Sequence, residues 1–152
     1  MSGGAKLKNL DAFKKRMEKR LKKNPALNIK TAMVRSTNVV RDTVVTSIAS
    51  GGAGRTYEKY NPRRTHTASA KGQPPATDTG VLVSGISTSV GVESNAVVGK
   101  IMAYAPTNQG DNYALFLEFG TKDMDARPFM QPALDRNAKK IRQIFVEEGV
   151  IE

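Results

Sequence analysis

Apolar residues recur at steps of three and four, the spacing of one helical face, in three parts of the chain. In the first part they are Leu7, Leu10, Phe13, Met17 and Leu21. This pattern predicts an amphipathic helix over about residues 6–23, which ends at Asn24-Pro25 because proline disfavours helical geometry in the residue before it.

The second and third parts predict two further helices. One runs from Asn28, expected as its N-cap, to about residue 50, where two glycines end it. Its Thr and Val content lowers intrinsic helix propensity, so a local strand stays an alternative. The other covers about residues 130–147, and Gly149 is expected to cap its end.

Between these helices, a Val-, Ile-, Ser- and Thr-rich region predicts two antiparallel strands over roughly 81–91 and 96–104. Glu93-Ser94-Asn95 forms the turn between them, and Lys100 and Met102 are expected on the face opposite Ile101. The stretch 113–119 fits a strand or a helix equally well. The fold class is therefore α+β, with two N-terminal helices, a long loop, a small antiparallel sheet and a C-terminal helix in a single domain, 1–152.

Residues 51–79 lack periodicity and contain three prolines, so we predict a long loop. Loops of this length are uncommon in compact domains and are usually functional, or disordered until a partner orders them. Cations and tyrosines interleave along it and would either contact phosphates or keep the loop solvated: Arg55, Tyr57, Lys59, Tyr60, Arg63, Arg64 and Lys71.

The net positive charge of the chain limits the classes of binding partner but does not identify a single one. The chain carries a formal charge of +10, and residues 6–23 hold nine Lys or Arg against two acidic residues, a local +7. This excess of positive charge favours binding to a polyanion: nucleic acid, an anionic membrane face or an acidic protein surface. No apolar stretch approaches the roughly 18 to 20 residues that a membrane helix needs, so we expect no membrane partner. Direct DNA binding remains the alternative function.

Candidate chemistry is sparse. The chain has no cysteine, and its only histidine, His66, lies in the predicted loop without a recognisable nucleophile, so we expect no catalytic residue, metal or cofactor. Glu118 stands between Leu117 and Phe119 and must find a partner if the segment is buried. Arg127 is the natural candidate for an ion pair, and capping of backbone groups is the other structural role.

Two segments resemble the tail-completion, or head-tail joining, proteins of long-tailed bacteriophages. The first reads Gly-x-Pro-Pro-x-x-Asp-Thr-Gly-x-Leu and has Gly72, Pro74, Pro75, Asp78, Thr79, Gly80 and Leu82. The second combines Glu-Phe-Gly-Thr with Ala-Arg-Pro-Phe and has Tyr113, Glu118, Phe119, Gly120, Thr121, Ala126, Arg127, Pro128, Phe129, Pro132 and Ala133. Val81 stands where the family often has an arginine. Any contact that this arginine makes in the family therefore cannot be assigned to the present chain.

The resemblance implies a virion structural protein without enzymatic activity, made in the host cytoplasm and placed in the neck. It implies a homo-oligomeric ring of six or twelve subunits between the head connector or stopper protein and the tail terminator or tail-tube proteins. DNA passes through such a neck, so the basic helix would face an acidic partner ring or make non-specific contact with DNA. Small neck proteins share similar architectures, so the layer is left open.

Within this reading, Gly120 and Thr121 let the backbone turn, Phe119 and Phe129 are buried on either side, and Pro128 fixes the entry to the last helix. Loop residues are expected at a subunit interface: Arg55, Tyr57, Arg63, Arg64, Pro74, Pro75, Asp78 and Gly80.

Overall fold

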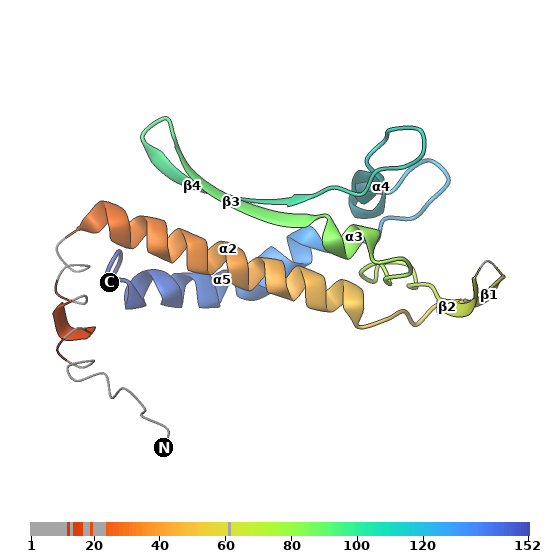
Figure 1. The fold of residues 1–152 in the computed structure, drawn as a ribbon, viewed down its shortest axis with the longest axis horizontal. Coiled ribbons are helices and arrows are strands. Elements are labelled where there is room, and N and C mark those ends of the chain that lie inside the picture. The colour runs from red at the N-terminus through yellow and green to blue at the C-terminus, as the bar shows by residue number, and fades with distance from the viewer. Residues whose placement is uncertain (1–11, 13, 17–18, 20–23, 61) are drawn as a thin grey trace, which may run out of the picture.

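Two long helices pack side by side in opposite directions and form the framework on which the other elements pack (Figure 1). The computed structural model describes residues 12, 14–16, 19, 24–60 and 62–152. The long helices are α2, Pro25–Ala49, and α5, Met130–Glu147. The end of α5 agrees with the prediction, and Gly149 follows it with a positive φ of 67°. The predicted helix over 6–23 lies mostly outside the described residues.

The start of α2 differs from the prediction. Asn24 is the N-cap, and its side chain accepts a hydrogen bond of 3.2 Å from the amide of Leu27. Pro25 occupies the first turn, where its missing N–H costs nothing. Asn24-Pro25 is therefore a start signal for α2, and Asn28 is wrong as the N-cap because it is a buried residue inside the helix.

One face of α2 builds the core. Val40, Val44 and Ile48 recur every four residues, are almost fully buried and pack in one cluster with Leu117 and Phe129. Burying aliphatic and aromatic side chains of this size is the main favourable term in folding. The strand alternative for this segment is therefore wrong, and tertiary packing supports a helix that is rich in β-branched residues.

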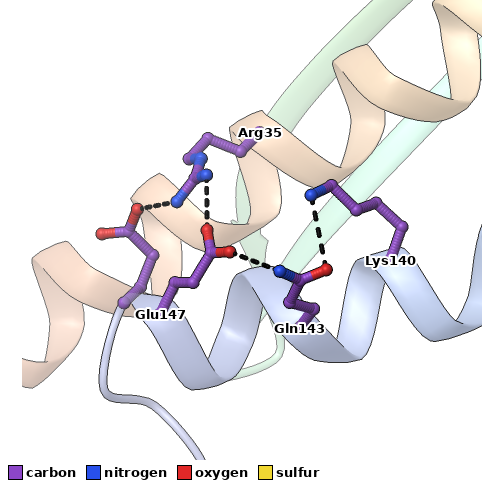
Figure 2. A network of polar contacts seen from close by, with 5 residues as sticks. Arg35, Lys140, Gln143 and Glu147 are labelled. Carbon is purple, nitrogen blue, oxygen red and sulfur yellow. Dashed lines mark hydrogen bonds and ion pairs between the residues drawn. The ribbon is translucent and has the colours of Figure 1, made fainter.

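A polar network joins Arg35, in the first half of α2, to the end of α5. Arg35 contacts Glu147 at 2.7 Å and Glu148 at 2.5 Å, and Gln143 donates to Glu147 at 2.9 Å (Figure 2). The hydrogen bonds to Glu148 and Glu147 raise the pKa of Arg35, and the same contact lowers the pKa of Glu147. Since the side chains of Arg35 and Glu147 are about 40% exposed, their ion pair orients the helices more than it stabilises them.

A β-hairpin lies along α2 (Figure 1). Strands β3, Ile86–Glu93, and β4, Ala96–Ala103, pair antiparallel, with Ile86 opposite Ala103. The turn at Ser94 and Asn95 and the outward position of Lys100 and Met102 confirm the predicted turn and the predicted facing of the second strand. Gly99 permits the close approach to α2, since a Cβ there would lie 2.5 Å from a methyl group of Thr37.

Three further elements depart from the predictions. Val81–Ser84 forms a short helix, α3, so the first strand starts at Ile86 instead of residue 81. The expected structureless segment 51–79 contains a second hairpin, β1, Thr56–Tyr60, and β2, Arg63–Thr67. The α+β class is confirmed, but the single sheet is wrong: the described residues hold two separate two-stranded sheets.

No helix within the described parts of the chain is both long and apolar enough to cross a membrane.

Candidate functional site

Helix α4, Tyr113–Phe119, is anchored to the end of β4 by one asparagine. The side chain of Asn112 accepts from the amides of Ala114 at 3.2 Å and Ala105 at 3.0 Å, and it donates to the carbonyl of Ala103 at 3.0 Å. Capping of this kind satisfies amide groups that the first helical turn leaves unpaired. The segment that fitted a strand or a helix is therefore helical.

The helical period decides which side chains of α4 are buried. Ala114 and Leu117 point into the core, each 2% exposed, whereas Phe119 is 77% exposed. The prediction that Phe119 is buried is wrong, because a residue two positions after Leu117 lies on the opposite side of a helix. Phe129 is 1% exposed, as expected.

Phe119 flanks an apolar depression of about 580 Å³, here called the apolar groove. Its walls come from β4, α4 and the start of α5, and include Ile101, Met130 and Phe129. Leu115 and Leu134, 54% and 46% exposed, also line it. Large apolar side chains gathered on one surface are typical of a site that another molecule covers.

Glu118 caps helix α5. Its carboxylate accepts hydrogen bonds from the backbone amides of Phe129 at 2.8 Å, Met130 at 3.0 Å and Gln131 at 3.1 Å. The positive end of the helix dipole adds to this interaction. Backbone capping is thus the role that the structure gives Glu118, and the ion pair expected with Arg127 is absent from the described contacts.

The link between α4 and α5 is a tight turn. Gly120 has a φ of 76°, and a Cβ there would lie 2.9 Å from the backbone of Met124 and Ala126, so only glycine fits. Thr121 pairs with Met124 in an isolated β-bridge. The amide of Arg127 donates to the carbonyl of Leu117 at 2.7 Å, which closes the turn.

Asp78 joins the hairpin β1–β2 to the segment before α3. Lys59 and Arg64, the latter at 3.0 Å, form ion pairs with it, and His66 Nδ1 lies 3.9 Å away. The hydrogen bond from Lys59 and the charge of Arg64 lower the pKa of Asp78 from its ordinary 3.8. Lys59 and Arg64 thus both favour the ionised form of this carboxylate.

The two segments that carry the resemblance meet around one cavity of about 430 Å³, here called the junction cavity. The segment before α3 contributes Pro75, Asp78 and Gly80, and the later segment contributes Tyr113, Leu117 and Arg127. The sequence placed these residues in separate regions, and the fold brings them together. Lys59, His66 and Ser69 are among the other polar residues of the lining. Sequence reasoning missed Ser69, because a small polar residue in a loop carries no signal of burial.

The remaining predicted site residues lie elsewhere. On β1–β2, Arg63 is exposed, and the guanidinium of Arg55 lies over the ring of Tyr57, 5.3 Å from its centre. Pro74 lines a shallow depression near the end of α2, and Pro132 is half-buried in the first turn of α5. Pro128 is half-buried directly before Phe129.

Within the described residues, no three His, Cys, Asp or Glu side chains gather as metal ligands would. Comparison of the chain with protein-family models, with curated proteins and with solved structures finds no match. The resemblance to neck proteins thus rests on the two sequence segments alone.

Proposed function

We propose that this protein is a structural subunit of a bacteriophage neck, where it forms a closed ring that completes the tail and joins it to the head connector. In this role the protein works through surfaces and makes or breaks no bond. The exposed apolar side chains of the groove carry the proposal, since they suit burial against a second protein surface.

A ring requires that one surface of each subunit contact a different surface of its neighbour. The apolar groove is one such surface, and we propose a second copy of the chain as its occupant. Phe119 and Leu115 project from α4 and would be the central apolar contacts. Buried aromatic side chains near the centre of an interface commonly dominate its energy. Val146, an exposed apolar residue of α5 outside the groove, provides the control position for the test below.

The test compares assembly of the wild type with the double variant Leu115→Ser/Phe119→Ser. Val146→Ser is the matched control, because Val146 is also an exposed apolar helical residue, 45% exposed, and lines no part of the groove. Size-exclusion chromatography with light scattering, alone and with candidate connector and tail proteins, measures the mass. Circular dichroism checks that each variant is folded.

We expect the wild type and Val146→Ser to reach a mass of six or twelve subunits, and the double variant to remain a folded monomer. Equal assembly of the double variant would contradict the role of the groove. A wild type that stays monomeric with every partner, yet retards random duplex DNA at moderate salt, would favour the DNA-binding alternative.

A further inference from the structure

The junction cavity carries an excess of positive charge. Asp78 is the only carboxylate among the described residues that line it. Lys59 in the lining and Arg64 outside it both pair with Asp78, so this carboxylate does not balance the charge that Arg127 adds to the lining. Among the described contacts, the side chain of Arg127 has no ion pair and no hydrogen bond, and its Nε is buried without a partner.

Ser69 provides a second, independent observation that points to a ligand at this cavity. Its side chain is 4% exposed, lines the same cavity, and has a buried hydroxyl without a hydrogen-bond partner. Buried polar groups in native proteins are usually paired, because an unpaired one loses its water without compensation. A buried guanidinium N–H and a buried hydroxyl at one cavity are both donors suited to an anion.

We propose that the junction cavity binds a carboxylate presented by an acidic peptide segment of another protein molecule. The planar guanidinium of Arg127 matches a carboxylate with two parallel N–H donors, and Ser69 in the same lining offers a hydroxyl donor. Pro75, Leu82 and Leu117 give the cavity apolar walls that suit the methylene groups of such a side chain.

A protein carboxylate fits this cavity better than a DNA phosphate. A volume of about 430 Å³ holds a side chain with its neighbouring backbone. The phosphates of a duplex lie on a stiff, wide rod and cannot reach a hydroxyl as deeply buried as that of Ser69. The inference goes beyond the proposed function, and its test uses only the isolated protein and small probes.

The test titrates the full-length protein with three probes and follows backbone and arginine Nε–H signals by ¹H–¹⁵N nuclear magnetic resonance. The probes are the blocked peptide Ac-Ala-Glu-Ala-NH₂, its neutral match Ac-Ala-Gln-Ala-NH₂, and inorganic phosphate. The variants are Arg127→Gln and Ser69→Ala. Arg142→Gln is the control, since Arg142 is exposed on α5 and lies away from the cavity.

We expect saturable shifts at the Arg127 Nε–H and around Ser69 with the Glu peptide, and none with the Gln peptide. Arg127→Gln should weaken binding about tenfold or more, Ser69→Ala about threefold, and Arg142→Gln less than about twofold. If Arg127→Gln does not fold, Ser69→Ala decides alone. Equal shifts with both peptides, saturation by phosphate only, or unchanged affinity in the cavity variants would overturn the proposal.

Discussion

The cap that Glu118 places on α5 makes Glu118→Gln the most informative stability change. The N-cap of α5, Phe129, has no side-chain capping bond of its own, so the carboxylate of Glu118 supplies acceptors for three amides at 2.8, 3.0 and 3.1 Å. An amide side chain keeps one acceptor oxygen, turns the other into a repelling donor, and removes the charge that the helix dipole favours.

Losing a cap typically costs about 0.5–2 kcal/mol, and hydrogen bonds to charged groups are worth about 1.5–3 kcal/mol. Because one acceptor survives, we expect Glu118→Gln to lower the free energy of unfolding by about 2 kcal/mol. For a domain of this size, that corresponds to a fall in Tm of about 4–8 °C. Urea and thermal unfolding followed by circular dichroism measure both.

Asp135→Asn is the matched control, since Asp135 is exposed on the same helix and accepts only from the side chain of Gln131 at 2.8 Å. Asp135→Asn removes one negative charge, as Glu118→Gln does, and we expect it to change the free energy of unfolding by no more than about 0.5 kcal/mol. If Glu118→Gln were as mild as this control, the capping interpretation would be refuted.

Other substitutions test the core, the turn and the Asp78 cluster, each by the same unfolding measurements. Phe129→Ala should cost about 3–5 kcal/mol, while Phe119→Ala should cost less than about 0.5 kcal/mol in the monomer; similar losses would contradict their assigned burial. Gly120→Ala should destabilise by more than about 1 kcal/mol, because the added Cβ meets backbone at a positive φ, and a neutral result would count against the turn. Asp78→Asn should lower stability near pH 7. Because Lys59 lowers the folded pKa of Asp78, this difference from the wild type should persist above about pH 4 and disappear as the pH falls through that lowered value; a difference that grows on acidification would contradict the ion pair.

Local sequence signals predicted the elements whose pattern and end signals agree. Helix α5 has a clear apolar face and a terminal glycine, and β3 and β4 alternate around a turn at Ser94 and Asn95. The hairpin β1–β2 escaped prediction because most of its side chains are exposed, so no alternation marks a buried face. The N-cap of α2 was predicted at Asn28 instead of Asn24, because Asn24-Pro25 was taken only as the end of the preceding helix and the same dipeptide can also begin one.

The candidate site was predictable only in its parts. The sequence singled out Glu118 and offered capping as one role, but the backbone amides that donate to its carboxylate lie 11 to 13 residues ahead, at the start of another helix. Phe119 was wrongly predicted to be buried, because a strand over 113–119 would place it on the same face as Leu117, whereas the helix α4 places it on the opposite face. The junction cavity depends on tertiary contacts that place Ser69 and Arg127 in the lining of one cavity, and no local pattern encodes them.

The most direct test of the neck role is electron microscopy of particles made by a phage whose copy of this gene is interrupted. We expect filled heads and tails to accumulate apart, and joined, infectious particles to form once the wild-type protein is supplied in trans. Joined and infectious particles formed without the protein would contradict the neck role.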